Sequence, residues 1–246
     1  MNTTSKSPQT KYSWQILSGS SLKIIAIILM LIDHIGAVVL YHGYLLPNAP
    51  IAEGTPIYDV YIFYQVLRFI GRSAFPIFCF LLVQGFLHTS NKRNYATRLF
   101  AFALISEIPF DIAIDNALIS FRAQNVFFTL LIGFFVLWLM EKWSDKIYLQ
   151  LFVVALGMGL AYLLRTDYSY WGILLISILY FFRTVLIVQT VAGSLSLLWE
   201  APAILSFIPI NMYNKKRGIS MKYFFYIFYP AHLLVLALIR YLVFNV

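Results

Sequence analysis

The chain has 246 residues, of which 61% are hydrophobic and 11% are charged, and its mean hydropathy is +0.80. Soluble domains carry about 25% charged residues, so this composition excludes an ordinary soluble enzyme and indicates a polytopic membrane protein. The formal net charge of +8 would suit a nucleic-acid-binding protein, but the basic residues are distributed as a topology signal, and we expect no nucleic-acid partner. The single cysteine, Cys79, excludes an intrachain disulfide and a multi-cysteine metal site.

Long apolar runs recur along the whole chain. A helix needs ~20 apolar residues to cross the ~30 Å hydrocarbon layer, so the runs predict an all-α, polytopic transmembrane helix bundle of about nine spans. We expect residues 1–13 to form a disordered basic tail and residues 14–246 a single transmembrane domain. The first run is too long for a signal peptide and lacks a small-x-small cleavage site, so it should stay as a span. The predicted spans are residues 22–41, 61–87, 96–115, 124–140, 147–164, 171–183, 184–198, 200–213 and 223–243.

The distribution of basic residues predicts the orientation and supports nine spans over eight, within an expected range of eight to ten. Cytoplasmic loops are enriched in Lys and Arg. The three predicted spans between 171 and 213 are short, and two longer helices are an alternative, but that count would turn the basic loop 214–218 outward. With nine spans and a cytoplasmic N-terminus, the outer side receives only Arg122, Arg165 and Arg240. The cytoplasmic side then holds thirteen of the eighteen basic residues: Lys6, Lys11, Lys23, Lys92, Arg93, Arg98, Lys142, Lys146, Arg183, Lys215, Lys216, Arg217 and Lys222.

Two ionisable residues, Asp33 and His34, lie inside the first predicted span. Charged groups in the hydrocarbon layer cost at least ~2.5–3.5 kcal/mol each, so they usually mark a functional site or a buried pair. Histidine is the natural general base near neutral pH, and a histidine that only packs between helices is the alternative. Lys23 precedes His34 by three helical turns, or ~16 Å, on the same face. It should therefore lie at the cytoplasmic interface. There, the alternative is that Lys23 only extends its ammonium group into water and has no further role.

Four further charges occupy the next two predicted spans: Arg68, Arg72, Glu107 and Asp111. The two arginines are four residues apart, as are the two acids, so each pair shares a helix face. Because the two spans are antiparallel, matching depths would pair Arg72 with Glu107 and Arg68 with Asp111, and a buried ion needs such a partner. These charges either hold two helices together or line a polar cavity in which an arginine binds an anionic group. Either acid is the expected carboxylate partner of His34.

Further polar side chains lie near the predicted ends of spans. His88 ends the second span on the cytoplasmic side, and the outer loop 42–60 either covers a cavity or only connects two spans. No two histidines have ligand spacing on one helix, so we expect no metal. The candidates for substrate binding are Arg122, Gln124, Asn125, Tyr229 and His232.

Seven separated segments of the chain, in this order, resemble the TraX family of bacterial membrane proteins. They are LKIIAIILMLIDHIGAVV, RFIGRSAFPIFCFLLVQGFLHTSN, ISEIPFD, QNVFFTLLIG, DYSYWGILLI, MYNKKRG and KYFFYIFYPAHLL, and they extend from about Leu22 to Leu234. The resemblance implies a protein of the bacterial plasma (inner) membrane. The founding TraX protein is associated with N-terminal acetylation of conjugative pilin. The family is also similar to membrane acyltransferases of the acyltransferase-3 type, in which an Arg-x10-His motif carries the catalytic histidine. Here Lys23 and His34 have that spacing, with lysine in place of arginine.

The resemblance implies an acyltransferase that takes its acyl group from acetyl-CoA or another acyl-CoA, without a metal. The acceptor would be an amine or hydroxyl of an envelope protein, glycan or lipid, with a pilin-like N-terminus indicated by the family. His34 would be the general base, and the other predicted catalytic residues are Asp33, Glu107 and Asp111. The residues expected to bind the CoA donor are Lys23, Arg68, Arg72 and His88.

Two functions of other classes remain open at this point. A small proton-coupled transporter could use the same carboxylates and His34 as a protonation relay. A non-catalytic assembly factor would have fully paired charges and no cavity. A narrow tunnel from the cytoplasm to His34 would favour the enzyme, and alternating access around a central site would favour the transporter.

Overall fold

The computed structural model describes residues 13–220 and 222–245, and it is helical apart from short connections. The predicted tail, residues 1–13, lies outside the described residues except for Ser13. Within the described ranges there is no strand, only two isolated bridges, between Leu17 and Tyr213 and between Gln124 and Thr166. The prediction of an all-α protein is therefore confirmed.

The helices follow one another with short connections. In chain order they are α1 (Gly19–His34), the π-helix η1 (Ile35–Leu45), α2 (Pro56–Gly71), α3 (Ala74–His88), α4 (Lys92–Asp115), α5 (Val126–Lys142), α6 (Ile147–Leu163), α7 (Ser169–Phe181), α8 (Leu186–Ser196), the 3-10 helix η2 (Leu198–Ser206), α9 (Phe207–Asn211) and α10 (Lys222–Phe244).

The second predicted span, residues 61–87, is divided into α2 and α3, with the break at Arg72 and Ser73. Pro76, in the first turn of α3, has no N–H to donate to the carbonyl of Arg72, which removes one helical hydrogen bond at this point. The sequence prediction of one continuous helix missed this interruption. The break between α2 and α3 places Arg72 at the C-terminal end of α2.

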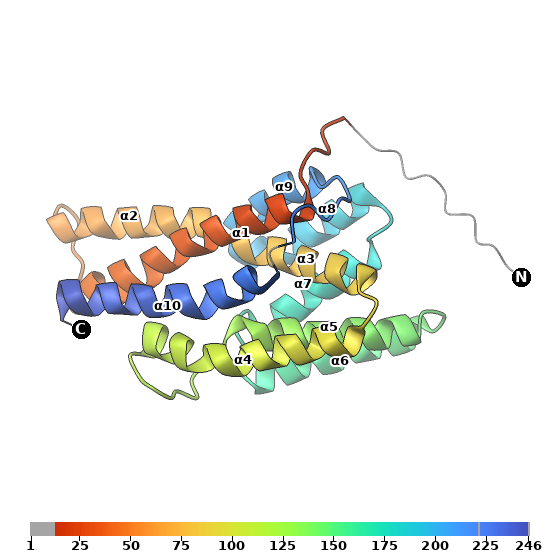
Figure 1. The fold of residues 1–246 in the computed structure, drawn as a ribbon. Helices are drawn as coiled ribbons and strands as arrows, with labels where there is room; N and C mark the ends of the chain where they lie inside the picture. The colour runs from red at the N-terminus through yellow and green to blue at the C-terminus, as the bar shows by residue number, and fades with distance from the viewer. Residues whose placement is uncertain (1–12, 221, 246) are drawn as a thin grey trace, which may run out of the picture.

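Three helical segments of the described chain are long and apolar enough to cross a membrane: Gly19–Leu45, Pro56–His88 and Tyr223–Phe244. α8 is shorter than the span that the sequence predicted at residues 184–198. α8 has 11 residues, about 16 Å at 1.5 Å per residue, which is only half of the ~30 Å hydrocarbon layer. η2 and α9 then lead the chain back toward the end from which α8 started (Figure 1). Residues 186–211 therefore form a helical hairpin, and neither of its arms has the length of a full crossing.

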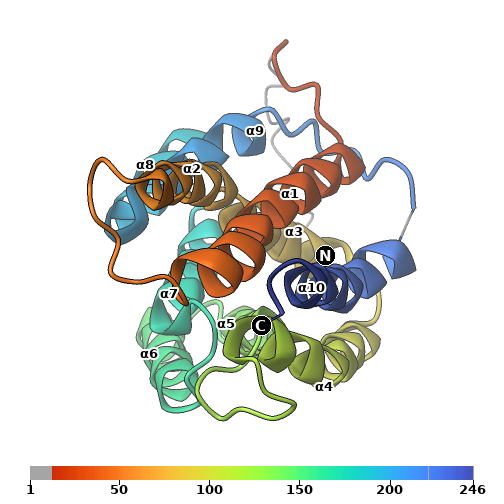
Figure 2. The same cartoon turned by 90° about the vertical axis from the view of Figure 1, so that its left-hand side faces the viewer.

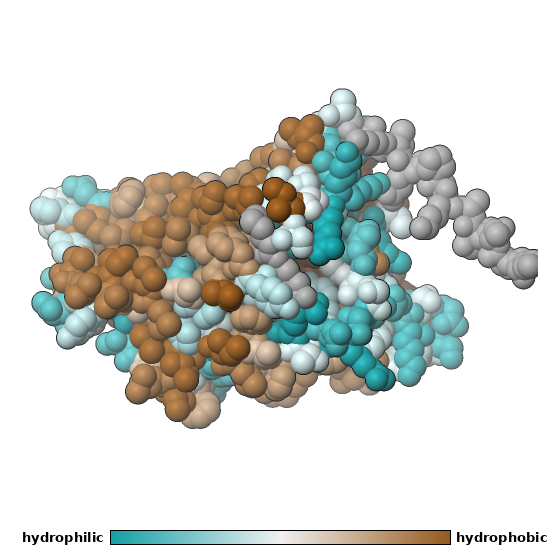
Figure 3. All heavy atoms as spheres, in the orientation of Figure 1, coloured by the Kyte–Doolittle hydropathy of each residue, from teal (hydrophilic) through white to brown (hydrophobic). Residues whose placement is uncertain are grey.

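The long helices lie side by side along one axis of the molecule. α1, α4 and α10 all start toward the right in Figure 1 and run toward the left, where the C-terminus lies. α10 lies between α1 and α4 (Figure 2), and the C-terminal half of α10 packs against η1. Hydrophobic residues cover the face formed by α1, α2 and α10, and hydrophilic residues gather at the right-hand end (Figure 3).

Candidate functional site

Two histidines from opposite ends of the chain meet between α1 and α10. His34 Nδ1 and His232 Nε2 are 2.7 Å apart, and the two rings lie nearly parallel with centroids 4.9 Å apart. His34 is half-buried and His232 is buried. His34 is the last residue of α1 before the chain changes to the π-helix η1. Such wide turns are rare and often mark functional sites.

The hydrogen bonds of this pair determine where each ring carries its proton. The backbone carbonyl of Phe228 lies 2.8 Å from His232 Nδ1 and can only accept, so His232 Nδ1 carries the hydrogen. In a neutral His232 the Nε2 atom is then an acceptor, and His34 Nδ1 must donate to it. The neutral His34 consequently has a lone pair at Nε2, which makes no hydrogen bond with the described residues. A ring held in this tautomer can act as a proton acceptor at Nε2.

Asp33 forms an ion pair with Arg68 of α2. Arg68 Nη1 donates to Asp33 Oδ2 over 2.5 Å, and both side chains are largely removed from solvent, with exposed fractions of 18% and 11%. α1 and α2 approach each other closely at this point, because a Cβ at Gly71 would lie 2.3 Å from the Cβ of Asp33. The glycine lets the backbone of α2 come next to Asp33, one turn after Arg68, the residue that pairs with the Asp33 carboxylate.

Arg72 is paired with a carboxylate from the helical hairpin. Its Nε atom lies 2.9 Å from Oε1 of Glu200, a residue of η2 whose own backbone departs from helical geometry. Asp167, in the connection between α6 and α7, is close enough to interact with Arg72, and burial raises the pKa of its carboxyl to about 6. Arg68 and Arg72 thus share one region of the molecule with three carboxyl groups.

The predicted pairing of Arg72 with Glu107 and of Arg68 with Asp111 is therefore wrong. The prediction assumed that the predicted second and third spans are antiparallel neighbours along their full length. Instead, α2 packs against α1 and η1, whereas α4 packs against α10 and α5, so the arginines meet Asp33 and Glu200. The expectation that Glu107 or Asp111 orients His34 is wrong as well, because His34 is bonded to His232.

Glu107 and Asp111 belong to a separate group that fixes the connection between α4 and α5. Glu107 Oε2 accepts from the side-chain amide of Asn125 and from its backbone N–H, the latter over 3.2 Å. Asp111 Oδ2 accepts from the backbone N–H of Ser120 over 2.7 Å. Both acids therefore bind backbone and side-chain groups of the α4–α5 connection, and neither contacts the histidines.

Several other predicted binding residues also lie away from the histidine pair. Arg122 is 81% exposed and lies 3.5 Å from Asp115. The backbone of Gln124 bonds to Arg165 and Asp167, and exposed His88 bonds to the carbonyl of Gln84 at the end of α3. Tyr229, by contrast, is buried next to the pair, with its ring edge-on to both histidines.

Sequence reasoning missed Glu200 and Gly71. Glu200 lies between two predicted short spans and was assigned to no site, although it is the only acid that follows Asp167 in an otherwise apolar C-terminal region. A single acid in such an apolar region was the available sign that Glu200 has a buried partner. Nothing in the sequence pattern distinguishes Gly71 from the other helical glycines, because its role follows from a contact between two helices.

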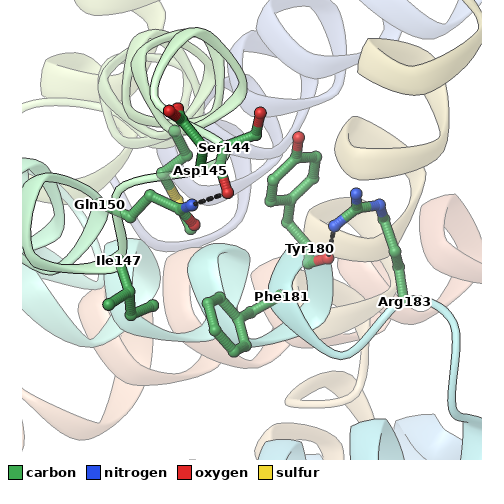
Figure 4. A pocket seen from close by; sticks show the side chains of 8 residues that line it. Ser144, Asp145, Ile147, Gln150, Tyr180, Phe181 and Arg183 are labelled. Atoms are coloured by element: carbon green, nitrogen blue, oxygen red, sulfur yellow. Dashed lines mark hydrogen bonds between the residues drawn. The ribbon is translucent and has the colours of Figure 1, made fainter.

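Two pockets of the described chain lie at the basic end. One, of about 250 Å³, is lined by residues of α5, α6, α7 and their connections, among them Gln150, Tyr180 and Arg183 (Figure 4). Arg183 in this pocket donates to the carbonyl of Tyr180 over 2.7 Å. The other, of about 330 Å³, is lined by Phe135, Trp138, Leu139 and Lys142. His34 lines neither of them.

One family model and one curated relative each match most of the chain. Residues 18–240 match the family model described as TraX protein. A curated relative, the probable fimbrial assembly protein FimC, serogroup H1, of Dichelobacter nodosus, is 29% identical over 251 residues. The alignment covers 89% of this chain and 94% of the relative. No solved structure matches the chain.

Proposed function

The chain belongs to the TraX protein family, and from that premise we propose that it is a membrane-bound acyltransferase, with acetyl-CoA or another acyl-CoA as donor and an envelope protein of pilus or fimbrial assembly as acceptor. The observation that carries the proposal is the hydrogen bond between His34 Nδ1 and His232 Nε2. The name of the FimC relative supports the choice of acceptor. As expected from the sequence, the proposed reaction uses no metal ion.

His34 is the general base in this mechanism. Its Nε2 takes the proton of the acceptor amine or hydroxyl as that group attacks the acyl carbon, and the imidazolium then returns the proton to the departing thiolate. His232 accepts from His34 Nδ1 and stabilises the charged ring as it forms, which is the role of the third member in nucleophile–base–orienter arrangements. The acyl thioester supplies the activated acyl group. A positioned base contributes about 10²–10⁴-fold to rate.

The paired arginines have a positioning role in this scheme. Arg68 holds Asp33, and Arg72 holds the turn of the helical hairpin through Glu200. A guanidinium group engaged with a carboxylate has fewer donors left for phosphate, so we assign the phosphates of the donor to other residues. Asp33 Oδ1 accepts no hydrogen bond from the described residues, and it can receive one from the acceptor next to His34.

We place the N-terminus of the protein in the cytoplasm of a bacterial cell and the protein in the inner membrane. The turns α3–α4 and α5–α6 and the segment before α10 lie at one end of the molecule (Figure 1), and they carry the basic residues that favour the cytoplasmic side. In this topology the hairpin 186–211 enters and leaves from the cytoplasm. The two predicted spans 184–198 and 200–213 become half-crossings, which keeps the predicted orientation of every other segment.

A non-catalytic assembly factor is the second candidate, and two observations favour it. Both central arginines are paired with carboxylates, and the two described pockets lie away from His34. A proton-coupled transporter has less support, because Glu107 and Asp111 bond to the α4–α5 connection and not to Asp33 or His34.

Turnover of acetyl-CoA by the purified protein separates the two candidates. Free thiol is measured with and without a peptide that has the N-terminal segment of the cognate pilin or fimbrial subunit. The acyltransferase releases thiol and the peptide gains one acetyl group, detected by mass spectrometry. An assembly factor would bind the peptide and release no thiol.

A further inference from the structure

A basic loop, residues 214–219, is attached to the first turn of α1. The backbone N–H of Gly19 donates to the carbonyl of Lys216 over 2.8 Å, and that of Ser20 donates to the carbonyl of Arg217 over 3.0 Å. In return, the N–H of Ile219 donates to the hydroxyl of Ser20 over 3.1 Å. Main-chain bonds therefore fix the loop on the helix, and the side chains of Lys216 and Arg217 remain exposed.

Gly218 allows this close attachment. Its φ is +73°, a conformation that favours glycine, and a Cβ there would lie 2.0 Å from the hydroxyl oxygen of Ser20. The N–H groups at the start of α1 are already bonded to the loop carbonyls and to the hydroxyl of Ser18. The end of the helix is thus not free to bind an anion, and the cationic side chains are the groups that can.

These cations have no acidic partner. Arg217 is close enough to half-buried Lys23 for their positive charges to repel, and the ammonium of Lys23 lies over the ring of Phe225, 5.1 Å from its centroid. All ten acidic residues of the chain lie in the described ranges, and none forms a salt bridge with Lys23, Lys216 or Arg217. Like charges held together in this way favour the binding of an anion.

We infer that Lys23, Lys216 and Arg217 form a binding site for a phosphate-bearing group at the cytoplasmic end of the molecule. The identity of the ligand rests on the proposed function: it is the nucleotide end of the acyl-CoA donor, which carries several phosphate oxygens. Arginine and lysine bind such groups through charge-assisted hydrogen bonds. The headgroup of an anionic phospholipid presents the same chemistry at this surface and is the other source of the phosphate.

The arrangement of α1 and α10 connects this site with the histidine pair. Lys23 and Phe225 meet at the inner ends of the two helices, and His34 and His232 meet further along the same two helices. On α1 the separation is eleven residues, or ~16 Å on one face. A donor bound by its phosphates at the loop therefore has an extended arm to direct along α1 and α10 toward His34.

Binding of coenzyme A to the full-length protein in nanodiscs of zwitterionic lipid tests the inference by calorimetry. The variant Lys216→Gln/Arg217→Gln keeps the backbone bonds of the loop and should bind coenzyme A at least about tenfold more weakly, given ~1.5–3 kcal/mol for a hydrogen bond to a charged group. Lys146→Gln removes an exposed charge from the α5–α6 turn at the same end and should bind as the wild type does. A parallel experiment counts bound phosphatidylglycerol by native mass spectrometry.

Each outcome decides the question. Weaker binding of coenzyme A by the double variant assigns the site to the donor, and loss of phosphatidylglycerol alone assigns the same phosphate site to a lipid headgroup. Unchanged binding of both ligands overturns the inference. His34→Gln should still bind coenzyme A, because His34 is not part of the phosphate site. If the wild type binds coenzyme A but transfers no acyl group, the acyltransferase proposal is refuted and the phosphate site remains.

Discussion

At the scale of single residues, hydrogen bonds set the tautomer of one histidine, His34, inside a mostly apolar bundle. The carbonyl of Phe228 sets the proton on His232, and His232 sets the proton on His34. The order of these bonds leaves Nε2 of His34 as the unprotonated atom. In the proposed mechanism His232 is accordingly a positioning residue, and its contribution should be separable from packing.

Replacing His232 tests this separation. His232→Phe removes the acceptor for His34 Nδ1 and should lower kcat of acyl transfer by about 10–100-fold, by analogy with losing the hydrogen-bond partner of a metal-bound histidine, with little change in KM. His232→Gln retains an amide oxygen that can accept the same hydrogen bond and should recover part of kcat. Equal activity of the two variants would show that the ring only fills space.

The sequence made Asp33 and His34 visible because ionisable groups inside a long apolar run are costly. Their partners could not be read in the same way. Arg68 was expected to meet Asp111 and instead meets Asp33, and His232 was expected only as a possible substrate-binding residue. Periodicity gives the face of one helix, but the neighbour of that face depends on how all the helices pack.

At the scale of helices, the contact between α1 and α2 depends on Gly71. Gly71→Ala should destabilise the protein by about 1–3 kcal/mol, the usual cost of overpacking, because the new methyl group would overlap Asp33. Gly159→Ala is the matched control, since a Cβ at that glycine in α6 meets no atom within 4 Å. It should be neutral or stabilising by about 0.5–1 kcal/mol.

Thermal unfolding in detergent compares the two glycine variants. A lower Tm for Gly71→Ala only, with transfer activity reduced as well, supports the close approach at Asp33. Similar Tm values for both variants would contradict it.

The ion pair between Arg72 and Glu200 attaches the hairpin 186–211 to the end of α2. In a double-mutant cycle of Arg72→Gln and Glu200→Gln, the stability losses should be non-additive, with a coupling energy of about 0.5–3 kcal/mol. A cycle of Arg72→Gln and Glu107→Gln should be additive, because Glu107 bonds to Asn125. Strong coupling in the second cycle and none in the first would restore the pairing predicted from sequence.

At the scale of the whole molecule, the all-helical architecture was predictable, since apolar runs and their polar breaks determine where helices begin and end. α10 (Lys222–Phe244) agrees closely with the predicted span 223–243. The division of α2 from α3 and the short hairpin 186–211 were not predictable to the same degree. Residues 184–213 have the composition of membrane spans, and only their length and the position of Glu200 in the fold reveal the hairpin.

Labelling of introduced cysteines tests the orientation. Ser220 is exposed in the basic connection before α10, and Glu53 is exposed in the loop between η1 and α2 at the opposite end. The native Cys79 is buried and should not react. A membrane-impermeant maleimide added to intact cells should label Glu53→Cys and spare Ser220→Cys, which should react only after the cells are opened. The reverse pattern would invert the topology and remove the donor site from the cytoplasm.

The measurement that tests the central claim most directly is acyl transfer by His34→Gln. His42→Gln is the control, because His42 is a half-buried histidine in η1, one helical segment beyond the site. With both variants inserted in the membrane and melting at the wild-type Tm, His34→Gln should lose about 10²–10⁴-fold of the transfer rate, and His42→Gln should keep it. Full transferase activity of His34→Gln would show that this histidine only packs between helices, and would contradict the mechanism.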